Sequence, residues 1–169
     1  MVIIIMGPTG SGKTTIGELL AQRLGWVFKD ADDYHSAANK AKMRAGIPLT
    51  DADRIPWLDT LHDQIESWLA NKQNVILACS ALKESYRQRL STNPEVRFVY
   101  LKGTYDLILQ RLKTRKGHFA NADILAGQFA DLEEPANALT VDISGTPEEI
   151  VDEICARLAL ACKGDPSRK

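Results

Sequence analysis

A glycine-rich segment close to the N-terminus contains the residue types that bind phosphate groups. Its sequence, Gly7-Pro8-Thr9-Gly10-Ser11-Gly12-Lys13-Thr14, matches the pattern GxxxxGK(S/T) at every fixed position. Glycines let the backbone curl until successive N–H groups point at phosphate oxygens, and a following helix directs its positive end at the same place. The Lys13 ammonium can reach the β- and γ-phosphates of ATP, and the Thr14 hydroxyl can bind Mg²⁺. The segment, together with Thr15, is therefore predicted to bind ATP.

A pair of carboxylates, Asp30 and Asp32, follows a short apolar segment at 27–28. Residues two apart on an extended chain face the same side. Both carboxylates could therefore face the γ-phosphate, one holding magnesium and the other an acceptor hydroxyl. The alternative is a solvated, aspartate-rich turn. The later apolar segment 75–79 ends in a cysteine, where a motor ATPase usually has an aspartate, and this argues against a motor ATPase. The sequence also has no NKxD guanine reader, which argues against a GTPase.

Basic residues lie at the start of a polar stretch, 114–121. Arg111 precedes this stretch, and Arg115 and Lys116 lie inside it. Such a segment suits a lid that brings positive charge over a transferring phosphoryl group and excludes water. The alternative is an exposed basic helix end.

The elements that must position these residues alternate between strands and helices. Apolar runs at Val2–Met6, 27–28, 75–79, 98–101 and 139–143 predict strands, and amphipathic segments lie between them. The last helix is expected to begin at Thr146-Pro147-Glu148-Glu149, which has the residues of a cap and a capping box. This alternation predicts an α/β fold with a parallel sheet, helices on both faces and ligands at the carboxyl ends of the strands.

Composition limits the partners and the setting. The chain has 169 residues and a net charge of −1, from 21 basic and 22 acidic residues. We expect no nucleic-acid or membrane partner, because such a chain has no broad positive field, and its N-terminal apolar run is too short to span a bilayer. Cys79, Cys155 and Cys162 are an odd number without a CxxC pair, which predicts free thiols in a reducing cytoplasm and no structural zinc.

Several motifs together resemble one family, the gluconokinases of the P-loop type, relatives of shikimate kinase and the nucleoside monophosphate kinases. The similarity runs from Ile3 to about Leu158. The motifs are Gly7 to Thr14; Asp30-Ala31-Asp32-Asp33-Tyr34-His35 with Asn39 and Met43; Gly46-Ile47-Pro48-Leu49 with Asp51, Asp53-Arg54 and Pro56-Trp57-Leu58; Cys79-Ser80-Ala81-Leu82-Lys83 with Tyr86-Arg87; Tyr100-Leu101-Lys102-Gly103; Arg111-Leu112 and Lys116-Gly117-His118-Phe119; and Gln128-Phe129 with Leu132-Glu133 and Pro135.

The resemblance implies a three-layer P-loop kinase fold in one domain, residues 1–163. It implies a five-stranded parallel sheet, a helical substrate-binding insertion at about 35–71 and a short lid at about 114–121. Residues 164–169 are expected to form a flexible tail. The implied activity is phosphorylation of D-gluconate at its 6-hydroxyl by ATP, in a homodimer.

The resemblance also implies roles for individual residues. Thr14 and Asp30 would hold Mg²⁺, Asp32 would orient and deprotonate the acceptor hydroxyl, and Lys13 and Arg115 would act on the transferring phosphoryl group. Adenine is expected at Arg111 and the loop 144–147. The residues assigned to gluconate are Arg54, Lys83 and Arg87 for its carboxylate, His35 and His118 for its hydroxyls, and Gln128. Ser36 departs from the family, which usually has proline there, and this affects only a helix start.

Two alternatives remain open at this stage. The chain could phosphorylate another small hydroxy acid such as shikimate, or it could be a nucleotide-binding module without turnover. Intact Lys13, Thr14, Asp30 and Asp32 argue against the second.

Overall fold

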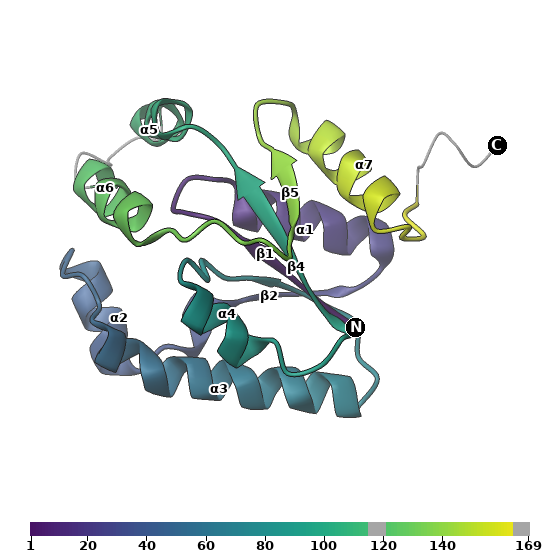
Figure 1. Cartoon of the computed structure of the whole chain (residues 1–169), viewed down its shortest axis with the longest axis horizontal. Coiled ribbons are helices and arrows are strands. Elements are labelled where there is room, and N and C mark those ends of the chain that lie inside the picture. Colours follow the sequence, from purple (N-terminus) through teal and green to yellow (C-terminus); the bar gives the residue numbers. More distant parts are fainter. Residues whose placement is uncertain (115–120, 164–169) are drawn as a thin grey trace.

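The computed structural model describes residues 1–114 and 121–163, and its centre is a five-stranded sheet (Figure 1). Neighbouring strands all run parallel, in the order β2-β3-β1-β4-β5. The strands are β1 (Val2–Met6), β2 (Val27–Asp30), β3 (Val75–Ala78), β4 (Val96–Lys102) and β5 (Leu139–Asp142). The predicted five-stranded parallel sheet is confirmed.

The central strand β1 shows why its sequence is uninterrupted and apolar. It pairs with β3 on one side and β4 on the other, and all five of its residues are completely buried. Ile3 and Ile5 pack into a cluster on one face of the sheet, whereas Val2, Ile4 and Met6 pack into a second cluster on the other face. A strand covered on both faces needs apolar side chains at every position.

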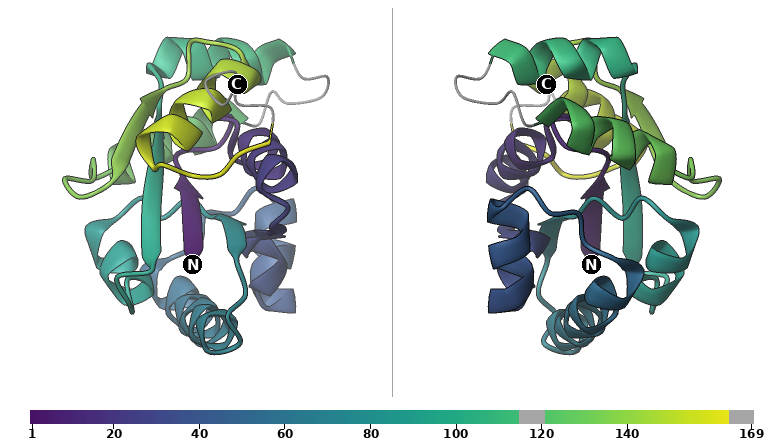
Figure 2. Two further views of the ribbon diagram at one scale, coloured as in Figure 1. Left: turned by 90° about the vertical axis from the view of Figure 1, so that its right-hand side faces the viewer. Right: turned by 90° about the vertical axis from the view of Figure 1, so that its left-hand side faces the viewer.

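Helices cover both faces of the sheet and complete three layers (Figure 2). They are α1 (Lys13–Leu24), α2 (Ala37–Arg44), α3 (Asp51–Ala70), α4 (Glu84–Leu90), α5 (Tyr105–Thr114), α6 (Asn121–Asp131) and α7 (Pro147–Arg157), with a 3-10 helix, η1 (Ala31–Tyr34). α1, α5, α6 and α7 contribute to the cluster around Ile3 and Ile5, and α3 and α4 contribute to the other. The predicted layer architecture is therefore confirmed.

Local sequence sets the ends of several helices. α7 begins with the predicted capping box, since the Glu149 amide donates to Thr146 Oγ1 at 3.2 Å and the Thr146 amide donates to Glu149 Oε2 at 2.8 Å. A second box, Thr50 with Asp53, begins α3. Ser36, the residue that departs from the family pattern, caps α2 by accepting the Asn39 amide at 3.1 Å. The substitution therefore preserves a helix start by another chemical route.

The described residues include only some of the predicted subdivisions of the chain. The stretch 35–71 contains α2 and α3, and its role as an insertion stays a prediction. Most of the predicted lid, 115–120, and the predicted tail, 164–169, lie outside the described residues. In the part of the chain that is described, no helix is long and apolar enough to cross a membrane.

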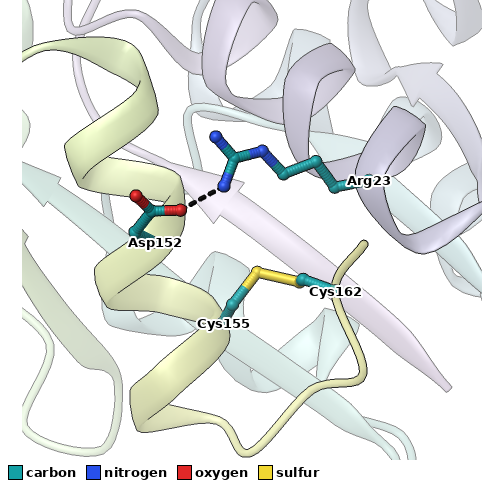
Figure 3. Close-up of a disulfide and its surroundings, with 4 residues drawn as sticks. All are labelled: Arg23, Asp152, Cys155 and Cys162. Carbon is teal, nitrogen blue, oxygen red and sulfur yellow. Dashed lines mark hydrogen bonds and ion pairs between the residues drawn. A yellow bond between two sulfur atoms is a disulfide. The ribbon is translucent and has the colours of Figure 1, made fainter. Parts of the chain in front are cut away.

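The prediction of three free thiols is wrong for two of the cysteines. Cys155 on α7 and Cys162 form a disulfide with a Cα–Cα distance of 6.1 Å (Figure 3). The chain turns back after α7 through Ala159, which has a φ of 52°, and this return brings the two residues together. A pair joined by such a turn does not have CxxC spacing, so the sequence pattern does not reveal it. Cys79 is free and buried.

Candidate active site

The phosphate loop connects β1 to α1 through three glycines in left-handed or unusual backbone conformations. Their φ angles are 149° at Gly7, 78° at Gly10 and 96° at Gly12. A Cβ at Gly7 would lie 2.8 Å from Ser11 Oγ and 3.1 Å from the Leu101 carbonyl oxygen. The loop thus needs glycine for both its angles and its close packing, and it ends at the N-terminus of a 12-residue helix.

A cavity of about 470 Å³ opens beside this loop and brings together residues from distant parts of the chain. Its walls include Lys13 from α1, Asp32 from η1, Arg54 from α3 and Gln128 from α6. These are polar groups of both charge signs around one space, at the carboxyl ends of β1 and β2. The arrangement suits an anionic ligand with a polar partner.

Lys13 is held close to the loop that precedes it. Its Nζ donates a hydrogen bond to the Pro8 carbonyl oxygen at 3.0 Å. Burial lowers the pKa of Lys13, and the carboxylates of Asp32 and Asp30 oppose this change. The ammonium therefore lies beside the loop and within the electrostatic influence of both carboxylates.

The two predicted carboxylates both line the cavity, although they do not lie on one extended segment. Asp30 ends β2, whereas Asp32 lies in η1, so the prediction of an extended chain through both residues is wrong. The cause is a local cap: Asp30 Oδ1 accepts the Asp32 amide at 2.9 Å and starts the 3-10 turn. Desolvation is the largest effect on Asp32 and raises its pKa. The neighbouring Asp30 carboxylate raises the pKa further, while Lys13 lowers it. Because the Asp32 side chain is 66% exposed, water weakens the desolvation effect.

His35 is almost completely buried, and its Nε2 lies 3.9 Å from Asp32 Oδ1. Its ring stacks on Trp57 with 4.3 Å between centroids, and Trp57 Nε1 donates to the Ala31 carbonyl oxygen at 2.7 Å. Burial, followed by the charges of Arg54 and Lys40, lowers the pKa of His35 to about 4. The imidazole is therefore neutral at physiological pH.

Comparison with known proteins agrees with this geometry. The shikimate kinase family model matches residues 9–159. The chain is 44% identical to a probable gluconokinase from Mus musculus, covering 93% of this chain and 97% of that protein. It is also 41% identical to the thermoresistant gluconokinase of Escherichia coli, covering 89% of each. A gluconokinase structure from Sinorhizobium meliloti superposes with a TM-score of 0.84 at 39% identity, over 94% of this chain and 91% of that one.

The chain belongs to the shikimate kinase family, and within it to the gluconokinases. It is accordingly a kinase. A shikimate kinase structure from Aquifex aeolicus, at 20% identity and a TM-score of 0.59, shares the fold alone.

The structure separates the basic residues that the gluconokinase resemblance assigned to the substrate carboxylate. Arg54 lines the cavity, and its Nη1 lies 3.3 Å from the Tyr86 hydroxyl. Lys83 bonds to both carboxylate oxygens of Asp51, at 3.1 and 3.2 Å, and does not line the cavity. Arg87 is 4% exposed and donates to the carbonyl oxygens of residues 81 and 82. The structure therefore brings only Arg54 of this trio to the cavity, and the roles of Lys83 and Arg87 stay predictions.

The remaining predicted residues have different positions. Arg111 donates from Nη2 to the Ile143 carbonyl oxygen, beside the loop that was expected to hold adenine. Arg115 and His118 lie outside the described residues. Gln128 lines the cavity, but its Oε1 accepts the Thr9 amide at 2.6 Å, so it contacts the phosphate loop.

Sequence reasoning missed two features of this site. It assigned no role to Asn39, which is buried next to His35. It also did not foresee that Gln128 contacts the loop, 119 residues away in the chain. For Asn39, the available signal was a polar residue four positions after His35, in the first turn of α2.

Proposed function

We propose that this kinase transfers the γ-phosphoryl group of ATP to the 6-hydroxyl of D-gluconate, giving 6-phosphogluconate and ADP. The observation that carries the proposal is the single cavity in which the phosphate loop, Asp32, His35 and Arg54 meet. The choice of acceptor is supported by relatives that are named as gluconokinases and that this chain matches over most of their length.

In the proposed complex, loop amides and Lys13 bind the triphosphate. The residues assigned to the nucleotide are Gly7, Pro8, Thr9, Gly10, Ser11, Gly12, Lys13, Thr14, Thr15 and, beside adenine, Arg111. Fixed donors around a transferring phosphoryl group lower the barrier because they need no reorganisation during the reaction.

Magnesium belongs to the proposal as the partner of ATP. Thr14 and Asp30 line the cavity, and the described residues contain no group of three or more His, Cys, Asp or Glu side chains that could hold a metal. This donor set fits Mg²⁺, which usually takes one or two protein ligands and completes its shell with water and phosphate oxygens. When bound, the ion would neutralise charge that develops on the phosphates.

The transfer step uses Asp32 as the proton acceptor. The 6-hydroxyl oxygen forms a bond to the γ-phosphorus, while the bond from phosphorus to the β–γ bridging oxygen breaks and ADP leaves. The hydroxyl proton passes to Asp32. Because the transition state is loose, an ordinary carboxylate placed by geometry is a sufficient base.

Recognition of gluconate needs one cation for its carboxylate and donors for its hydroxyls. We assign the carboxylate to Arg54 and a hydroxyl to His35. Lys83, Arg87, Arg115 and His118 keep the roles that the resemblance implies, whereas we assign Gln128 to the phosphate loop, because its Oε1 accepts the Thr9 amide. A homodimer in the cytoplasm completes the proposal, and light scattering on the purified protein tests the dimer.

A coupled ADP-release assay over a panel of acids tests the function. We expect rapid ADP formation with ATP and gluconate, slow formation with shikimate or with the neutral polyol sorbitol, and 6-phosphogluconate as product by ³¹P–¹H NMR. Preference for another acid would refute the proposed substrate. The absence of ADP with every acid would refute turnover.

A further inference from the structure

The two ring nitrogens of His35 have different neighbours. Nε2 points toward Asp32, 3.9 Å from Oδ1. Nδ1 lies 3.4 Å from Nδ2 of Asn39 on α2. Both His35 and Asn39 are 7% exposed, so these contacts are shielded from bulk water.

The orientation of the Asn39 amide is fixed by a third group. Its Nδ2 donates to the Asp53 carbonyl oxygen at 2.8 Å. A carbonyl oxygen only accepts hydrogen bonds, so the amide nitrogen and not Oδ1 must face Asp53. The second hydrogen of the same nitrogen is then the one that meets His35, and Nδ1 must be an unprotonated acceptor. A neutral imidazole carries one N–H, which is therefore on Nε2.

We propose that Asn39 is a positioning residue that holds His35 as the neutral Nε2–H tautomer. His35 then donates a hydrogen bond to a substrate hydroxyl, and Asp32 rather than His35 receives the proton of the attacking hydroxyl. This inference rests on the proposed function for its substrate, whereas the tautomer itself follows from contacts within the protein. His35 has no free lone pair for a proton, because Asn39 occupies Nδ1.

The charges around the ring also favour the neutral imidazole. Arg54 from α3 and Lys40 from α2 disfavour the imidazolium, and burial disfavours it further. Asp32 from η1 faces Nε2 and is the acidic partner. The Trp57 ring covers one face of the imidazole and contributes no charge. The neutral donor form is thus maintained by packing as well as by Asn39.

Nitrogen NMR of the ¹⁵N-histidine-labelled protein tests the tautomer without any substrate. His35→Gln identifies the His35 signals among the three histidines. At pH 7 we expect Nε2 to show the shift of a protonated nitrogen and Nδ1 that of an unprotonated one, with no titration between pH 6 and 8. A protonated Nδ1, or titration near neutral pH, would overturn the proposal.

A charge-matched pair of variants tests the role of Asn39. Asn39→Asp replaces the donor with an acceptor, so the proton should move to Nδ1 and the pKa of His35 should rise. We expect kcat/KM for gluconate to fall about tenfold, the loss of roughly one hydrogen bond, with a new inflection in the pH profile near neutrality and unchanged ATP affinity. Ala38→Asp adds the same charge at an exposed position of α2 and should leave all three unchanged.

These outcomes separate the inference from the proposed function. If gluconate proves not to be the substrate, the NMR signals still report the tautomer. If gluconate is the substrate but Asn39→Asp leaves the tautomer and the pH profile as in the wild type, Asn39 does not position His35.

Discussion

Gln128 could act either on the nucleotide or on the substrate, and its variant tells the two roles apart. The sequence resemblance assigns it to gluconate, whereas its Oε1 accepts the Thr9 amide of the phosphate loop at 2.6 Å. Gln128→Ala removes this bond and leaves a loop amide without its partner. Because α6 reaches the loop through this side chain, we expect the loop to become less well ordered for triphosphate binding.

The magnitude follows from the bond that is lost. A neutral hydrogen bond contributes about 0.5–1.5 kcal/mol net, which corresponds to roughly a two- to tenfold loss in affinity. Calorimetry with a non-hydrolysable ATP analogue measures this loss directly, and steady-state kinetics measures KM for gluconate in the same variant. We expect weaker nucleotide binding and a gluconate KM within about twofold of the wild type, a margin of ~0.4 kcal/mol.

A matched variant controls for general effects of the truncation. Gln22→Ala makes the same change at an exposed position of α1 and should alter neither constant. If Gln128→Ala binds nucleotide normally but raises KM for gluconate, the reasoning from the Thr9 contact is refuted and the assignment from the resemblance stands.

Three further predictions concern the substrate clamp, the acid response and the disulfide. Arg54→Ala should raise KM for gluconate by roughly ten- to a hundredfold, the loss of a charge-assisted bond, while KM for ATP stays nearly constant; equal effects on both would remove Arg54 from the clamp. The Thr50 amide and then the Lys42 ammonium lower the pKa of Asp53 to about 2 from 3.8, so its contribution to stability is complete above about pH 4 and is lost as the pH falls toward 2. Urea unfolding of Asp53→Asn between pH 2 and 5 should therefore show a shallower loss of stability than the wild type, and identical slopes would contradict this. Cys155→Ser opens a loop closed across a sequence separation of 7 and should lower the free energy of unfolding by about 2 kcal/mol, which corresponds to a fall in Tm of roughly 5 °C. The wild type measured with reductant should show the same Tm as this variant. An unchanged Tm in both would show that the disulfide contributes no stability.

The sequence predicts the sheet and the phosphate loop well because both depend on local signals. Val2–Met6 is continuous and apolar since β1 is buried on both faces, and the loop glycines occupy fixed spacings because their φ angles require it. The capping box at Thr146 is another local signal, complete within four residues. Such features can be read without knowledge of the rest of the fold.

Contacts between distant segments are where sequence reasoning was incomplete. Asp32 was expected on an extended chain, but the Asp30 side chain caps a 3-10 turn that the apolar pattern does not reveal. Arg87 is of a type that could bind a carboxylate, yet its guanidinium donates to the carbonyl oxygens of residues 81 and 82. Nothing in the spacing of Gln128 indicates its contact with Thr9, because the two residues are 119 positions apart and the position of α6 depends on the whole fold.

Turnover of Asp32→Asn tests the central claim most directly, because that claim places one carboxylate at the acceptor hydroxyl beside the bound triphosphate. With saturating ATP and gluconate, rapid-quench measurement of 6-phosphogluconate should show transfer slowed by roughly 100-fold or more, with the affinity for the ATP analogue within about twofold of the wild type, ~0.4 kcal/mol. Transfer at a rate close to that of the wild type would contradict the assignment of Asp32 and the mechanism built on it.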